Sequence, residues 1–148
     1  MITIEQIINH CRNRSYMSGV ERDDLRVKAT GEVFTPTPLV QEVLDQLDPA
    51  LFQDPTKTFC DPSCGDGQFL SEVLIRKLEA VAVEGVVSLQ QFEQALSTIH
   101  GLELMPDNAQ LCRDRLLCGQ WQFKHIVDEN IVQCDSLTYN PLTNKLFA

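Results

Sequence analysis

Three acidic residues and one glycine-containing turn carry the chemistry that this sequence offers to a ligand. Asp61, Glu103 and Asp135 each end a short apolar stretch with the composition of a buried strand. Gly65 and Gly67 follow the first of these acids, and glycine allows a tight turn and a close approach of the backbone to a ligand. Because parallel strands end side by side, we expect the three carboxylates to meet around one nucleoside-like molecule.

Each carboxylate also has a plainer interpretation. An isolated Asp or Glu after a strand is most often a helix cap or a surface charge. Glu103 favours binding, because a carboxylate at the end of a second strand can accept hydrogen bonds from the two vicinal hydroxyls of a ribose. The joint placement of three such acids therefore favours a ligand site over three unrelated caps.

Two common nucleotide sites do not fit these residues. The dinucleotide fingerprint requires a third glycine where this chain has Leu70, and it expects its acidic residue about 20 positions on, much nearer than Glu103. A phosphate-binding loop requires Gly-Lys-Ser or Gly-Lys-Thr after the turn, and neither is present. The expected ligand is a nucleoside with a ribose and a polar tail but no phosphates, and S-adenosylmethionine fits that description.

Local signals predict the helices that position the turn. Thr3 with Gln6 and Ser88 with Gln91 form capping-box patterns, which are typical of helix starts. The first helix is expected over about Ile4–Tyr16. Apolar spacing predicts further helices over 39–47, 68–83 and 107–117. A glycine at position 85 is expected to end the helix over 68–83.

Three short apolar stretches predict strands over 57–60, 98–104 and 131–134. The element order helix, strand, helix, helix, strand, helix, strand is typical of an α/β protein with a parallel sheet. We therefore predict one α/β domain.

Composition restricts the partners. The chain has 148 residues, 43% of them hydrophobic and 22% charged, which is typical of a soluble domain with one core. We expect neither a membrane span nor a secretion signal, and a cytoplasmic location. The net charge of -9 argues against tight binding to bare DNA, because phosphates require clustered Lys and Arg.

The cysteines and histidines predict no metal site. The six cysteines contain no C-x-x-C pair, and the three histidines are scattered. We expect reduced and mostly buried thiols.

Four segments resemble the N6-adenine DNA methyltransferases of γ-type motif order, in which the cofactor motifs precede the catalytic one. Gly31–Pro36 (GEVFTP) looks like the family's first cofactor segment, and Asp61–Gly67 (DPSCGDG) looks like its D-P-A/S-C-G-S-G turn. Gly101–Pro106 (GLELMP) looks like its second-strand acidic motif, and Cys134–Leu137 (CDSL) looks like its third. The resemblance implies a Rossmann-like S-adenosylmethionine-dependent methyltransferase fold, with a truncated parallel sheet and flanking helices.

The resemblance also implies a role for each segment. The Thr-Pro loop would hold the methionine end of S-adenosylmethionine, and the glycine turn would wrap the methionine moiety. Glu103 would bind the ribose, while Asp135 would accept a hydrogen bond from the adenine amino group. The implied cofactor-binding residues are Phe34, Thr35, Pro36, Asp61, Pro62, Ser63, Cys64, Gly65, Glu103, Leu104, Met105, Asp135, Ser136 and Leu137.

The family's catalytic motif, N-P-P-Y or D-P-P-Y after a fourth strand, is missing from these 148 residues. Asn140–Pro141 lies too close to Asp135 for a strand to fit between them, and we interpret the pair as a turn. No residue is assigned to catalysis. We expect an N-terminal helical segment over 1–30 and an incomplete cofactor-binding domain over 31–148.

A missing fourth strand would leave the edge of the first strand unpaired. Proteins usually cover such an edge, so either the N-terminal helix and the Phe147-bearing tail lie on it or another chain pairs with it. We expect a homo-oligomer or a complementing subunit, with DNA bound through that partner.

Three functions remain open. The first is the S-adenosylmethionine-binding half of a DNA adenine-N6 methyltransferase. The second is a regulatory module that binds the cofactor without catalysis, and the third is a methyltransferase with an RNA, protein or small-molecule acceptor.

Overall fold

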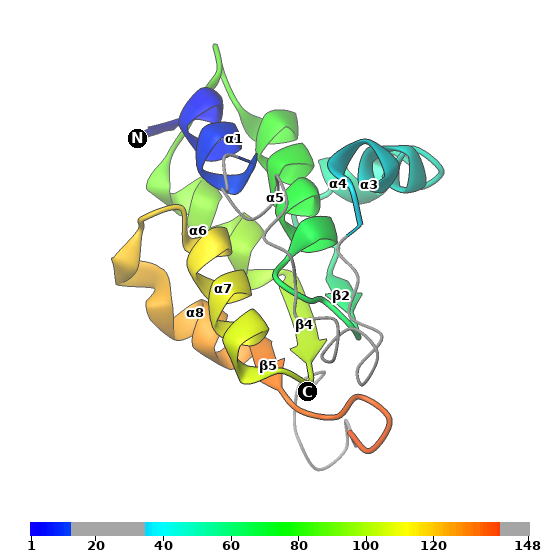
Figure 1. The fold of residues 1–148 in the computed structure, drawn as a ribbon. Helices are drawn as coiled ribbons and strands as arrows, with labels where there is room; N and C mark the ends of the chain where they lie inside the picture. Colours follow the sequence, from blue (N-terminus) through cyan, green and yellow to red (C-terminus); the bar gives the residue numbers. More distant parts are fainter. Residues whose placement is uncertain (13–34, 140–148) are drawn as a thin grey trace.

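A small parallel sheet surrounded by helices forms the centre of the protein (Figure 1). The computed structural model describes residues 1–12 and 35–139. All pairings in this sheet are parallel. In sheet order, its strands are β2 (Phe59–Asp61), β4 (Ile99–Glu103) and β5 (Ile131–Gln133). The predicted α/β fold with a parallel sheet and flanking helices is therefore confirmed.

Helix α5 is the central element of the packing. It contacts β2 and β4, and Figure 1 shows α1 and α7 on one side of it with α3 and α4 on the other. Leu70, Leu74 and Leu78 recur at intervals of four, and each is at most 2% exposed. The described helices are α1 (Ile4–Arg12), α3 (Thr37–Leu44), α4 (Ala50–Gln53), α5 (Gln68–Val81), α6 (Leu89–Ser97), α7 (Pro106–Leu117) and α8 (Lys124–Asn130), with a short 3-10 turn, η2 (Trp121–Phe123).

Both predicted capping boxes are present. The Thr3 amide donates to Gln6 Oε1 at 3.0 Å, and the Gln6 amide donates to Thr3 Oγ1 at 3.1 Å. The same exchange joins Ser88 and Gln91 at 2.8 and 3.1 Å. Helix α1 is described as far as Arg12, so the predicted extension to Tyr16 lies outside the described residues.

The predicted end of α5 is wrong. The helix ends at Val81, and the glycine at position 85 serves a hairpin turn instead of a helix stop. Glu84 and Gly85 have φ angles of 52° and 73°, which is the backbone of a two-residue primed turn. Val83 and Val86 exchange two backbone hydrogen bonds of 3.0 Å across it. The chain forms a hairpin here and not a longer helix, because these valines can pair as strands. The helical spacing of the apolar residues did not reveal this pairing.

Two further features were not predicted. Strand β3 (Val86–Val87) pairs antiparallel with β1 (Ile2–Thr3), which ties the start of the chain to the end of α5. Helix α8 lies directly before β5, and α4 lies between α3 and β2. Both helices are short and begin without a side-chain cap, so the sequence carries little local signal for them.

The apolar face predicted for 39–47 is only partly correct. Helix α3 ends at Leu44, and only Val40 and Leu44 are buried. Leu39 and Val43 are 48% and 44% exposed, and Leu47 lies beyond the helix and is 38% exposed. A helix that packs on α5 along one narrow line buries residues four apart and leaves the flanking positions in solvent.

None of the six cysteines forms a disulfide in the structure. Cys11, Cys64 and Cys112 are buried, Cys118 and Cys134 are half-buried, and Cys60 is exposed, so fewer thiols are buried than expected. Within residues 1–12 and 35–139, no cluster of three or more His, Cys, Asp or Glu side chains could hold a metal ion. In the same described part, no helix has the length and apolarity needed to cross a membrane.

Candidate functional site

The carboxyl ends of the three parallel strands meet, as the sequence predicted. The Cys64 amide donates to the Leu102 carbonyl, and the Cys134 amide donates to the Glu103 carbonyl, both at 2.9 Å. These bonds continue the strand pairing beyond β2 and β5, so the segments that follow both strands are held against the end of β4. The glycine turn, Glu103 and the start of the Cys134–Leu137 segment are thereby brought to one edge of the sheet.

The glycines of the turn are required by its geometry. Gly65 and Gly67 have φ angles of 56° and 96°, in the left-handed region that favours glycine. A side chain at Gly67 would place its Cβ 3.1 Å from Cys112 Sγ on α7. A Cβ at Gly65 would point toward Glu103 Oε2, at 3.8 Å. The Gly65 turn therefore lies directly beside the Glu103 carboxylate.

Glu103 has one carboxylate oxygen held by the protein. Its Oε1 accepts a hydrogen bond from the Met105 amide at 3.1 Å, while Oε2 lies on the side of Gly65. The residue is only 9% exposed, although its side chain is acidic. A carboxylate that is fixed in this way presents a well-oriented acceptor to a hydroxyl group.

Asp61 lies half-buried at the end of β2. Its Oδ1 accepts a hydrogen bond from the Ser63 amide at 3.0 Å, which shapes the first part of the turn. Burial raises the pKa of Asp61, and the bond from Ser63 opposes that shift only in part. An apolar groove of about 260 Å³ runs beside Asp61 and is lined by Leu44, Phe59, Cys60, Pro62, Phe69, Leu70 and Val73.

Replacing Asp61 by Asn is expected to stabilise the protein by roughly 0.5–1 kcal/mol at pH 7. A raised pKa means that the folded state favours the protonated acid. The favourable contribution of Asp61 to the free energy of unfolding is therefore present below the ordinary pKa of 3.8. It is lost as the pH rises through the raised pKa of the folded state. Urea unfolding of both proteins from pH 3 to pH 7 measures the difference. A gain that is equal at both ends of this range would contradict the assignment.

Exposed leucines flank the acidic residues at the other strand ends. Leu104 is 51% exposed and Leu137 is 94% exposed. Asp135 is itself exposed, and its Oδ1 accepts a hydrogen bond from the Leu137 amide at 3.0 Å. Met105 and Ser136 are half-buried. Apolar side chains beside carboxylates form a surface on which a planar base could pack.

The start of α3 is held against the start of α5. The side-chain Nε2 of Gln68 donates to the Thr35 carbonyl, and Gln68 is the first residue of the helix that follows the turn. Pro36 occupies the N-cap position of α3. The bond from Gln68 places the Thr-Pro segment next to the residue that follows the glycine turn. Phe34 and Asn140–Pro141 lie outside the described residues.

Cys64 has a packing role in the turn. Its side chain is 4% exposed and lies against Gly101, where an added Cβ would come 2.9 Å from Cys64 Sγ. A hydrogen bond with Cys112, together with burial, raises the pKa of the Cys64 thiol. The thiol is therefore neutral, and it locks the turn onto β4 without offering a nucleophile.

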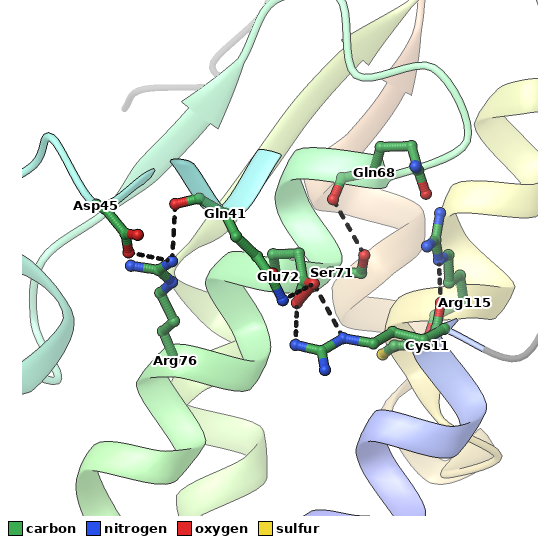
Figure 2. A network of polar contacts seen from close by, with 9 residues as sticks. Cys11, Gln41, Asp45, Gln68, Ser71, Glu72, Arg76 and Arg115 are labelled. Atoms are coloured by element: carbon green, nitrogen blue, oxygen red, sulfur yellow. Dashed lines mark hydrogen bonds and ion pairs between the residues drawn. The ribbon is translucent and has the colours of Figure 1, made fainter. Parts of the chain in front are cut away.

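Several polar residues next to the site were not singled out by the sequence. Asp66 and Arg115 form an ion pair of 3.6 Å in which both side chains are 1% exposed. On α5, Glu72 accepts two hydrogen bonds from Arg12, at 3.0 and 2.9 Å, and one from Gln41 at 3.3 Å (Figure 2). For the ion pair, the only signal in the sequence was an aspartate between two glycines, because its partner Arg115 lies far from Asp66 along the chain.

Comparison with known proteins gives one match. A family model described as N-6 DNA methylase matches residues 24–145, a stretch that includes all four motifs described above. No curated protein and no solved structure matches the chain.

Proposed function

We propose, because the chain belongs to the N-6 DNA methylase family, that it binds S-adenosylmethionine and forms the cofactor-binding part of a DNA adenine-N6 methyltransferase. One observation carries the proposal. The glycine turn after β2 lies beside Glu103, whose carboxylate is fixed at the end of the neighbouring parallel strand. This is the place where open α/β sheets bind nucleosides.

The residues present fit this cofactor. Gly65 lies beside Glu103, and that carboxylate would accept from the ribose hydroxyls. Asp61 and the adjoining turn would face the positively charged methionine end, while Leu104 and Leu137 would pack on the adenine. When bound, the cofactor supplies an electrophilic methyl group on a sulfonium sulfur.

We further propose that the residues that orient the target adenine come from a partner chain, either a second copy or a complementing subunit. The 148 residues lack the family's catalytic motif. Among the described residues, β2 pairs only with β4, and all three of its residues line the apolar groove. Helix α1 packs on α5 and α7, away from that edge (Figure 1). The acidic net charge also favours DNA binding through the partner, and we place the complex in the cytoplasm.

Calorimetric titration with S-adenosylmethionine tests the cofactor site. The isolated chain is expected to bind, and failure to bind would contradict the proposal. Transfer of a tritiated methyl group to adenine-containing DNA then separates the remaining functions. Transfer that appears only with a partner supports the complementing subunit, and transfer by the monomer contradicts it. Labelling of RNA or protein but not DNA would indicate a different acceptor.

Self-association has its own measurement. Light scattering at high protein concentration is expected to show a dimer or a larger assembly if a second copy pairs with β2. A monomer from which no partner can be recovered would leave a cofactor-binding module without catalysis as the better function.

A further inference from the structure

Arg115 links the glycine turn to the N-terminal helix. It lies on α7 and is 1% exposed. Its Nη1 lies 3.6 Å from Asp66 Oδ1, and its Nε donates to the Cys11 carbonyl at 2.7 Å. Figure 2 shows the guanidinium between the start of α5 and the last turn of α1. One buried side chain therefore contacts two segments that are distant in the sequence.

Asp66 is the middle residue of the Gly65–Gly67 turn, so the ion pair acts on the backbone that would face the cofactor. The same side of α7 also supports the next residue, because a Cβ at Gly67 would lie 3.1 Å from Cys112 Sγ. Cys112 and Arg115 are three residues apart on one helical face. The glycine turn therefore packs on this face of α7.

The last turn of α1 is attached through each of its final residues. The His10 ring hydrogen-bonds the Asp114 carbonyl at 3.3 Å, and Arg12 binds Glu72 on α5. Together with the bond from Arg115 to Cys11, these contacts fix α1 to the two helices that lie beneath the turn. The N-terminal helix is thus mechanically connected to the candidate site.

A buried ion pair is a poor means of gaining stability, because desolvation of both charges offsets most of their attraction. The hydrogen bond from Arg115 Nε to the Cys11 carbonyl and the charge contact with Asp66 instead restrict the positions of the segments that Arg115 joins. We propose that Arg115 is a positioning residue, which holds the Gly65–Gly67 turn through Asp66 in the shape that binds the cofactor. The inference rests on the proposed function and adds a second layer of residues to it.

The test uses Asp66→Asn, Arg115→Met and the double variant in the full chain. Asp45→Asn is the matched control, because it removes a carboxylate that binds an arginine of α5, Arg76, and takes no part in the contacts between α1, α7 and the turn. Hydrogen exchange in the ligand-free proteins is read at the Cys64 and Gly67 amides, which bond to Leu102 and Cys64 carbonyls. Calorimetry with S-adenosylmethionine is performed well below each melting temperature.

The Asp66 and Arg115 variants are expected to exchange these two amides about tenfold faster and to bind the cofactor about 10- to 100-fold more weakly. The double variant should bind the cofactor no more weakly than Arg115→Met, because Asp66 is proposed to act through its contact with Arg115. The Asp45→Asn control should show neither effect. If Arg115→Met does not fold, hydrogen exchange and calorimetry of Asp66→Asn and the double variant test the positioning role.

Unchanged exchange and binding within twofold in a folded variant, with normal binding by the unaltered chain, would overturn the positioning role alone. Absence of binding by the unaltered chain would overturn the proposed function as well. Equal loss in the Asp45→Asn control would show that the effect is not specific to the buried ion pair, and would also overturn the inference.

Discussion

Glu103→Gln is expected to weaken S-adenosylmethionine binding by about 10- to 100-fold, because a hydrogen bond to a charged group contributes about 1.5–3 kcal/mol. The substitution keeps a carbonyl oxygen that can still accept from the Met105 amide, so the local fold should survive. It replaces the second oxygen, on the side of Gly65, with a donor that cannot accept from a ribose hydroxyl. Calorimetric titration of both proteins measures the loss.

The control for this experiment is Glu93→Gln, the same chemical change at an exposed position of α6. It should leave the dissociation constant unchanged. The melting temperature of Glu103→Gln should stay close to that of the unaltered chain, which separates lost binding from lost folding. A Glu103→Gln protein that binds within twofold of the original would remove Glu103 from the site.

Gly101→Ala is expected to destabilise the protein by about 1–3 kcal/mol, the usual cost of overpacking a core. The new Cβ would lie 2.8 Å from Leu70 Cδ1, 2.9 Å from Cys64 Sγ and 3.0 Å from Cys64 Cβ. These atoms belong to the turn and to the first helical residues after it, so the strain should also displace the candidate site. Thermal unfolding should show a decrease of about 3–10 °C.

A double-mutant cycle with Cys64→Ala identifies the cause. Removing Sγ relieves one of the close contacts, so Cys64→Ala should cost less in the Gly101→Ala background than in the original protein. A coupling of about 0.5 kcal/mol or more is expected for residues in contact. Strictly additive effects would show that the loss at Gly101 has another origin.

The sequence predicted the elements whose signals are local. The capping boxes at Thr3 and Ser88 are correct because a cap involves residues only three apart. The three parallel strands are also correct, although β2 begins two residues later than expected and β4 and β5 each end one residue earlier than expected. The hairpin after α5 and the exposed side of α3 were missed, since valines and leucines fit either a helix or a strand until their neighbours are known.

The candidate site was predicted in the same uneven way. The structure holds the ends of β2, β4 and β5 together, which follows from the pairing of parallel strands. It could not be foreseen that Glu103 would be almost buried with one oxygen occupied, or that Cys64 would pack on Gly101. These properties depend on side chains from separate segments that meet only in the folded chain.

By itself, the sequence determined which residue types stand at the strand ends, because turns, caps and strand lengths are set by neighbours within a few positions. Only the tertiary structure decided that Arg115 is buried beneath the glycine turn and bound to α1. An arginine on an amphipathic helix ordinarily lies in solvent. Its burial requires a carboxylate and a carbonyl supplied by distant parts of the chain, and no local pattern encodes that meeting.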